Sequence, residues 1–179
     1  HNGGQHSIIQ IVETDKSAQL NKVNLTANNG DWFCFSPDEG RKCKHLKKGC
    51  NIVVMSPLLK IDKEVNHHCA CDAVVLIMEE NGLKVVYIDL KSGNPVGYSS
   101  QFKSTRQFVR YLIGLYNEFN DENLEITDER YVIFFGGQKN LLNKTTTIPK
   151  HRASQSKPDE AYKRMIENNG TVFLKELLA

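Results

Sequence analysis

Apolar residues gather in short runs along the chain, and their spacing separates predicted strands from predicted helices. Runs with the length and β-branched content of strands cover residues 52–55, 72–78, 83–90 and 131–135. Between the last two runs, residues 100–119 carry apolar side chains at the three-and-four spacing of an amphipathic helix. Residues 7–23 mix apolar and polar side chains in a way that suits a helix before the first strand. The predicted order of elements is therefore α-β-β-β-α-β.

This order indicates an α/β fold with a central mixed sheet flanked by helices. Residues 72–78 and 83–90 are apolar on both faces, as expected of strands that are covered on both sides. The Asn81-Gly82 pair between them is a strong hairpin signal. We therefore expect these two strands to be neighbours in the middle of the sheet.

The chain has the size of a single domain. Its 179 residues fall within the roughly 100 to 200 that usually share one hydrophobic core, and we place that core at about 52–135. Residues 138–179 are expected to form a C-terminal appendage, with a short helix near 159–167 and a last apolar run at 171–178. Residues 1–4 resemble a remnant of cloning or an internal cut rather than a signal peptide.

Composition narrows the class of protein. Hydrophobic residues make up 40% and charged residues 25% of the chain, as in ordinary globular proteins. The formal net charge of +2 excludes a basic coat over the whole surface, so a site for a polyanion must be local. No stretch reaches the roughly 18 apolar residues of a membrane helix, and we expect no membrane partner. The five cysteines all lie between Cys34 and Cys71, which favours a reducing compartment, the cytoplasm or the nucleus.

Three charged residues interrupt the apolar hairpin at its open end. Asp72 begins the first strand, and Asp89 and Lys91 end the second. A two-residue turn at Asn81-Gly82 would place Asp72 opposite Lys91, whereas a four-residue turn would place it opposite Asp89. In both registers the three side chains share one face of the sheet, because side chains along a strand alternate with a period of two.

Two carboxylates that lie close together repel each other, and a hard divalent cation held between them relieves that repulsion. Mg²⁺ or Mn²⁺ suits such oxygen ligands, and the carbonyl of Leu90 is a further candidate ligand. A cation of this kind activates water for attack on a phosphodiester, and Lys91 is placed to orient or deprotonate the water or to stabilise the transition state. The simpler alternative is a strand end held by salt bridges with no metal.

The hairpin resembles the signature of the PD-(D/E)XK nuclease superfamily, an Asp on one strand followed by (Asp or Glu)-x-Lys on the next. The matching residues are Asp72, Asp89 and Lys91, and the resemblance covers about 52–135. It implies a restriction-endonuclease-like αβββαβ core, a metal held by Asp72 and Asp89, and cleavage of nucleic acid. We expect DNA, in preference to RNA, as the partner.

A second match lies on the helix that follows the hairpin. Gln107 and Tyr111 are similar to the Q-x-x-x-Y motif of the RecB-like exonuclease branch and lie one turn apart, where they would meet the nucleic-acid backbone or support the active site. The chain departs from the family at Cys71, where a proline usually precedes the first Asp. No cysteine follows Cys71, so no iron-sulfur cluster is expected. His45 and Glu13 are the candidates for the family's upstream ligand.

Basic residues form two local clusters. Lys103, Arg106 and Arg110 share one face of the predicted helix, and Lys44 and Lys47 belong to a basic run upstream of the hairpin. Beside a site that cleaves phosphodiesters, both clusters are candidate contacts to the nucleic-acid backbone. The alternative is that they are ordinary solvated surface.

Cysteine and histidine residues gather upstream of the hairpin, which raises zinc as an alternative cofactor. The residues concerned are Cys34, Cys43, His45, Cys50, His67, His68, Cys69 and Cys71. No Cys-x-x-Cys pair occurs and the spacings match no common zinc module, so we favour buried thiols over a zinc site.

Three functions stay open. The favoured one is a single-domain, metal-dependent nuclease over residues 1–179. The alternative from another class is a nucleic-acid-binding or assembly module that keeps the fold without cleaving. An RNA endonuclease of the viral cap-snatching type shares the fold and size. An oligomer or a larger complex is compatible with each.

Overall fold

The computed structural model describes residues 6–13, 15, 17–28, 30, 32–37, 67–137 and 152–179. The predicted strand at 52–55 and the residues Lys44, His45 and Lys47 lie outside this described part. The described residues form an α/β fold with two sheets and few helices, so the prediction of an α/β fold in general is confirmed. None of the helices in the described part is both long enough and apolar enough to cross a membrane.

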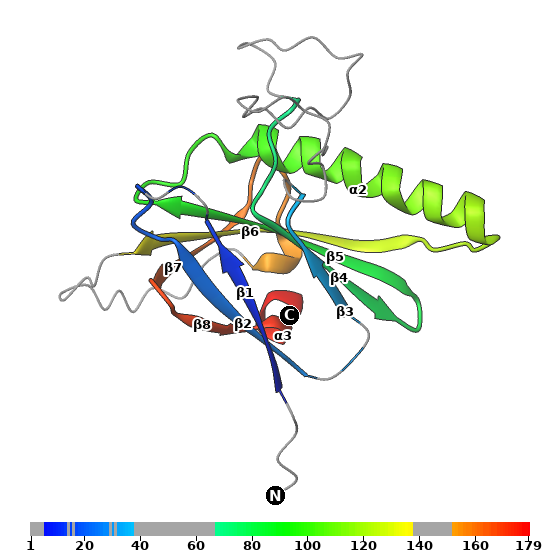
Figure 1. The fold of residues 1–179 in the computed structure, drawn as a ribbon, viewed down its shortest axis with the longest axis horizontal. Coiled ribbons are helices and arrows are strands. Elements are labelled where there is room, and N and C mark those ends of the chain that lie inside the picture. The colour runs from blue at the N-terminus through cyan, green and yellow to red at the C-terminus, as the bar shows by residue number, and fades with distance from the viewer. Residues whose placement is uncertain are drawn as a thin grey trace, which may run out of the picture.

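A five-stranded mixed sheet forms the centre of the molecule (Figure 1). Its strands, in spatial order, are β3 (Trp32–Phe35), β4 (Ala73–Glu79), β5 (Gly82–Ser92), β6 (Ile126–Gly137) and β7 (Tyr162–Glu167). β3, β4 and β5 pair antiparallel, whereas β6 and β7 run parallel to β5. The strands predicted at 72–78, 83–90 and 131–135 are therefore confirmed, and they lie side by side in the sheet.

The turn between β4 and β5 fixes the register that the sequence left open. Glu79 pairs with Gly82, so the turn itself consists of residues 80–81. Continued to the other end of the hairpin, this register brings Asp72 opposite Asp89. The opposition of Asp72 and Asp89 is thus the second of the two predicted registers, but a two-residue turn at 80–81 produces it, and both predicted turns, Asn81-Gly82 and a four-residue turn, are wrong.

Gly82 is the residue that permits this turn. Its φ of 124° lies where side chains other than hydrogen are strained. A Cβ atom at this position would lie 2.8 Å from the carbonyl oxygen of Glu125, which also accepts a hydrogen bond from the Leu83 N–H. Glycine therefore allows the start of β6 to approach the turn closely.

The helix α2 (Tyr98–Asn120) covers one face of the central sheet and connects β5 to the parallel strand β6 (Figure 1). The helix predicted at 100–119 is confirmed. Aromatic rings fill the space beneath it: Tyr87 and Tyr131 stack with ring centroids 4.9 Å apart, and Phe102 meets Tyr131 edge-on at 5.5 Å. These buried rings fix the helix against β5 and β6.

A three-stranded sheet covers the opposite face. It consists of β1 (His6–Val12), β2 (Lys22–Asn28) and β8 (Thr171–Phe173), in the order β1-β2-β8, and α3 (Leu174–Leu178) follows it. Leu25 of β2 and Leu177 of α3 share a buried core with Val75, Ile88 and Phe134 of the central sheet. The molecule is thus built in layers: α2, the central sheet, and the smaller sheet with α3 (Figure 1).

Two predicted helices are wrong. Residues 7–23 contain β1 and the start of β2, because buried Ile9 and Ile11 alternate with exposed positions at the period of a strand. Residues 159–167 contain β7, whose side chains also alternate and which pairs with β6. The last apolar run, 171–178, divides into β8 and α3. The second face of the central sheet is therefore covered by a sheet and not flanked by a helix of the predicted kind.

Replacement of Leu25 by alanine tests the role of the smaller sheet. Leu25 is fully buried, so we expect Leu25→Ala to lower the free energy of unfolding by about 2–5 kcal/mol, from lost burial and the cavity left behind. Ile8→Ala is the matched control, because Ile8 lies in the same sheet with 64% of its surface exposed, and its effect should stay within about 0.5 kcal/mol. Urea denaturation measures both, and equal losses would contradict this packing.

Candidate active site

The charged residues of the hairpin meet at the edge of the central sheet where β4 begins and β5 ends. Asp72 directly precedes β4. Asp89 and Lys91 lie two and four positions after the buried Tyr87 on β5, and therefore on the face that α2 covers. Asp89 is completely buried, with 0% of its surface exposed. A carboxylate in such a place is costly unless a partner compensates its charge.

Contacts within the site hold both carboxylates incompletely. The Leu90 N–H donates to Asp72 Oδ2 at 2.5 Å, and Lys91 Nζ lies 2.7 Å from Asp89 Oδ2. Neither oxygen of the buried Asp89 has a hydrogen-bond donor of good geometry among the described residues, and Oδ1 also lacks an ion-pair partner, although the Asp72 carboxyl lies within hydrogen-bonding reach. Buried carboxylate oxygens are normally bonded, so Asp89 can take a further ligand, either a proton shared with Asp72 or a cation.

The two carboxylates also disturb each other's ionisation. Burial, and next the negative charge of Asp89, raise the pKa of Asp72 well above its usual range, and the charge of Glu13 adds to the effect. Burial likewise raises the pKa of Asp89, although Lys91 opposes this shift. When both carboxylates are ionised, the site carries more negative charge than its own lysine neutralises, and a divalent cation would relieve this excess.

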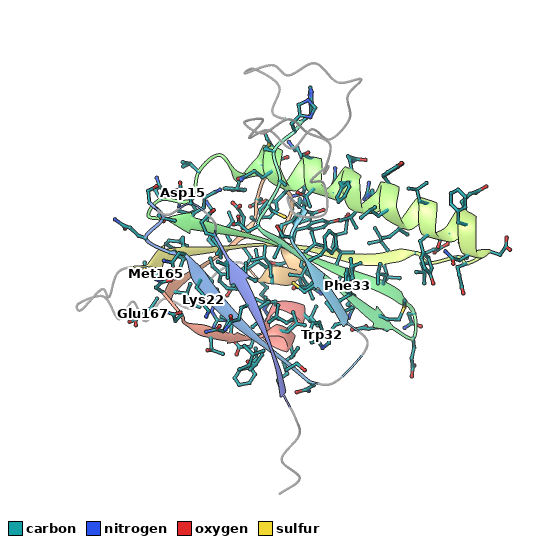
Figure 2. All side chains as sticks on the ribbon, viewed as in Figure 1. Asp15, Lys22, Trp32, Phe33, Met165 and Glu167 are labelled. Atoms are coloured by element: carbon teal, nitrogen blue, oxygen red, sulfur yellow. The ribbon has the colours of Figure 1, made fainter. Side chains whose placement is uncertain are left out.

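Glu13 reaches the site from the smaller sheet. It follows β1 directly, and its charge acts on both Asp72 and Asp89. Glu13 Oε1 accepts a hydrogen bond from the N–H of Asp15, which Figure 2 labels, at 2.9 Å. Of the two upstream candidates, Glu13 is thus brought near the carboxylate pair, whereas His45 lies outside the described residues.

Ser92 joins the two sheets beside the site. Its Oγ atom accepts hydrogen bonds from the N–H groups of Gln19 and Leu20, at 2.7 and 3.1 Å. Ser92 is the last residue of β5 and follows Lys91 in the chain. The turn between β1 and β2 is therefore fixed to the strand end that carries the charged residues.

The donor set of the site suits Mg²⁺ or Mn²⁺. Asp72 and Asp89 would hold the cation, and Leu90, which follows Asp89 in the chain, donates its backbone N–H to Asp72. Among the described residues, no three His, Cys, Asp or Glu side chains are grouped closely enough to hold a metal by themselves. Mg²⁺ is nevertheless commonly bound by two carboxylates, with water in its remaining coordination positions. The unpartnered oxygen of Asp89 could supply one of the carboxylate ligands.

Helix α2 contributes a residue that the sequence did not single out, Gln101. Its Oε1 atom accepts a hydrogen bond from Lys91 Nζ at 2.8 Å, and its Nε2 atom donates to the carbonyl of Ala70 at 3.1 Å. The only signal in the sequence was a polar residue in the first turns of the helix, one turn before Thr105, which is itself fully buried. Polar residues at that spacing on a helix that must pack are candidates for such contacts.

Two neighbours of Gln101 hold the chain that leads to Asp72. Ser104 Oγ donates to the carbonyl of His67 at 2.6 Å, and Thr105 Oγ1 accepts the N–H of Cys71 at 3.0 Å. Proline has no N–H, so a proline at position 71 could not make the contact that Cys71 makes with Thr105. The position of Asp72 is therefore set by α2.

Gln107 and Tyr111, the residues of the Q-x-x-x-Y resemblance, lie elsewhere. Both are exposed, Tyr111 to 62%, and neither makes a hydrogen bond or ion pair with Asp72, Asp89 or Lys91. Gln107 lies two residues and Tyr111 six residues beyond Thr105, the last residue of α2 that bonds to the segment before Asp72. The structure thus brings Gln101, and not Gln107, to the lysine.

The basic face of α2 is partly neutralised within the protein. Lys103 lies 2.5 Å from a carboxylate oxygen of Asp159, and Arg110 lies 2.9 Å from one of Glu129. Arg106 is half-buried, and its Nε atom has no hydrogen-bond partner among the described residues. Lys103 and Arg110 would have to exchange these carboxylates for phosphates in order to bind nucleic acid.

Two of the three thiols in the described part, those of Cys34 and Cys71, are poorly suited to zinc. Burial raises the pKa of Cys34 to about 11 and raises that of the fully buried Cys71 further. Zinc binds the thiolate form, which such shifts disfavour. Cys43 and Cys50 lie outside the described residues.

Replacement of Asp72 by asparagine tests the charge repulsion. Because the pKa of Asp72 is raised on folding, the folded protein binds more protons than the unfolded chain between the usual pKa and the raised one, and stability falls as the pH rises through this interval. Asparagine keeps an oxygen for the Leu90 N–H but has no charge. We expect Asp72→Asn to unfold at a higher temperature than the wild type at pH 7 in EDTA, and to lose this advantage below about pH 4.

Asp121→Asn serves as the control for that comparison. Asp121 is exposed at the end of α2 in a left-handed conformation that asparagine also adopts. Its replacement should leave the unfolding temperature unchanged at both pH values. If Asp72→Asn is no more stable than the wild type at pH 7, the carboxylates do not repel each other as described.

Comparison of the chain with known protein families, curated proteins and solved structures finds no match. The function must therefore be inferred from the geometry of the site. That geometry consists of two opposed carboxylates, a lysine bonded to one of them, and a buried carboxylate oxygen that lacks a partner.

Proposed function

We propose that this protein is a metal-dependent nuclease that hydrolyses phosphodiester bonds, with DNA favoured over RNA. The observation that carries the proposal is the buried Asp89, whose Oδ1 atom has no partner although Asp72 and Lys91 lie beside it. The salt bridge with Lys91 leaves that oxygen unsatisfied, whereas a cation, or a proton shared with Asp72, would satisfy it. The cation would in addition relieve the repulsion between the two carboxylates when both are ionised. Mg²⁺ and Mn²⁺ are the cations that this donor set suits.

The arrangement of elements supports the proposal. From β3 to β6 the described part runs β-β-β-α-β, with the first three strands antiparallel and the fourth parallel to the third. The order matches the β-β-β-α-β part of the core that the resemblance to the PD-(D/E)XK superfamily implies if β3 takes the place of the first strand expected at 52–55; the expected leading helix is replaced by β1 and β2. In this alignment Asp72 would precede the second strand, and Asp89 and Lys91 would lie at the end of the third, as the signature requires.

Each residue of the site has a task in such a reaction. Asp72 and Asp89 bind the cation, and the Leu90 N–H keeps Asp72 in place. The bound cation would lower the pKa of a water molecule and neutralise charge on the phosphate. Lys91 holds its ammonium group beside Asp89, where it can orient the attacking water or stabilise negative charge on the scissile phosphate.

Activity of point variants tests this assignment. We expect the wild type to cleave DNA with Mg²⁺ or Mn²⁺, and Asp89→Ala to lose cleavage because the cation loses its buried ligand. Lys91→Ala should lower the rate by about 10²–10⁴-fold, as expected for loss of a group that transfers or orients a proton. Lys84→Ala, on the same strand but paired with Glu79 at the far end, is the control and should cleave normally.

The assay should include single- and double-stranded forms of both DNA and RNA. Cleavage of RNA alone would favour the cap-snatching type of endonuclease over a deoxyribonuclease. If Asp89→Ala and Lys91→Ala cleave as fast as the wild type, the assigned residues do not form the active site.

A groove between the sheet and the second half of α2 favours a second candidate function, a binding or assembly module. Its lining comes from β3 and its neighbouring strands and from the helix, and it is apolar, with Trp32, Phe33, Leu112 and Tyr116 among its residues. Trp32 and Phe33 are labelled in Figure 2, and 62% of the Phe33 surface is exposed. Exposed apolar surface of this kind often marks protein contacts.

Thermal unfolding with and without Mn²⁺ separates the two candidates. A site that binds the cation only in the folded state gains about 2.7 kcal/mol at a concentration of 100 times the dissociation constant. We therefore expect Mn²⁺ to raise the unfolding temperature of the wild type and not that of Asp89→Ala, in differential scanning fluorimetry. A wild type that neither responds to Mn²⁺ nor cleaves any substrate would favour the binding module.

A further inference from the structure

We propose that Gln101 is a positioning residue for Lys91, and that it keeps the ammonium group in place once a cation binds the carboxylate pair. The inference rests on the nuclease function proposed above. It concerns a contact that neither the hairpin signature nor the Q-x-x-x-Y resemblance includes.

Lys91 Nζ has two acceptors of different kinds. One is the charged Oδ2 atom of Asp89 at 2.7 Å, and the other is the neutral Oε1 atom of Gln101 at 2.8 Å. A cation bound by Asp89 would compete with the lysine for the charge of that carboxylate, and its own positive charge would repel the ammonium group. The amide of Gln101 is neutral and would not be drawn to the cation as strongly as the Asp89 carboxylate. Its oxygen therefore remains an acceptor for Lys91 after the cation has bound.

The side chain of Gln101 is itself fixed in the orientation that this role needs. Its Nε2 atom donates to the carbonyl of Ala70 at 3.1 Å, so the amide oxygen is the atom that faces Lys91. A lysine presents only donors, so the reversed amide would lose both bonds. Ala70 is held in turn because Ser104 and Thr105 bind the backbone on either side of it, at His67 and Cys71.

The consequence is that Gln101 links the lysine to the segment that leads to Asp72. Ala70 lies two residues before Asp72, so Gln101 joins the end of β5 to the segment that leads into β4. A free lysine side chain has several rotatable bonds and loses considerable entropy when it is held at one place. Because Gln101 already holds Lys91 in the folded protein, this entropy is lost on folding and not when substrate binds.

Two substitutions of Gln101 separate this role from general packing. Gln101→Met keeps the length of the side chain but removes the acceptor. Gln101→Glu keeps an oxygen that can accept from Lys91, although it loses the donor to Ala70. We expect Gln101→Met to lower kcat by about tenfold or more at nearly unchanged KM, because a hydrogen bond to a charged group is lost. Gln101→Glu should restore most of that loss.

The chemical accessibility of Lys91 gives a second measurement that does not depend on cleavage. The full-length protein is treated with formaldehyde and dimethylamine-borane, with and without Mn²⁺, and the methylation rate of Lys91 is measured by peptide mass spectrometry relative to that of Lys84. In the wild type, Mn²⁺ should change this ratio little. In Gln101→Met, Mn²⁺ should raise it by about tenfold, because both acceptors of the lysine are then weakened or lost.

The control is Ser104→Ala, which loosens the same segment without removing a contact of Lys91. It should lower the unfolding temperature while leaving the response of Lys91 to Mn²⁺ as in the wild type. If Ser104→Ala and Gln101→Met expose Lys91 equally, the effect is structural and the inference is overturned.

Failure of the inference and failure of the proposed function give different results. A wild type that cleaves and is stabilised by Mn²⁺, with a Gln101→Met variant that matches it in kcat and in lysine methylation, overturns the role of Gln101 alone. A wild type that neither cleaves nor responds to Mn²⁺ overturns both.

Discussion

The register of the β4–β5 hairpin determines whether this chain has a charged site at all. Glu79 pairs with Gly82, and the same ladder carries Asp72 to a position opposite Asp89. A slip of one residue would turn one of these carboxylates to the other face of the sheet. The pairing persists although burial and mutual repulsion oppose it, because apolar cores on both faces and the parallel partner β6 hold β5 in place. The rest of the fold therefore maintains an electrostatic arrangement that the hairpin alone would avoid.

The helix α2 packs against the central sheet and also positions residues of the candidate site. Its aromatic contacts with β5 and β6 set its position over the sheet, and its first turns then bind the segment that leads to Asp72. Cys71, directly before Asp72, shows how this is done. Its N–H is held by Thr105 of the helix, so a hydrogen bond fixes the backbone at the entry to β4.

The sequence predicted the centre of the fold better than its covering layer. The strands at 72–78 and 83–90 are apolar on both faces, a pattern that leaves little choice of structure, whereas residues 7–23 contain apolar positions compatible with either period over a short window. The register stayed open because two turn lengths were consistent with the residues at the hairpin tip. Gln101 could not be identified because its contacts depend on the position of α2 over the sheet. That position is set by tertiary packing and cannot be read from the sequence of the helix. The opposed carboxylates could be predicted because charges at the end of an apolar strand are unusual in themselves.

The bonds from Gln19 and Leu20 to Ser92 bear on the order in which this molecule takes shape. They join residues 73 and 72 positions apart in the chain, and β2 also pairs with β8, near the C-terminal end. Contacts of such long sequence separation carry a large loop-closure entropy and form late. The β1–β2 hairpin can make all of these contacts only when both β5 and β8 are available to it. The layer that lies beside Asp72 and Asp89 therefore depends on segments that are far apart in the chain.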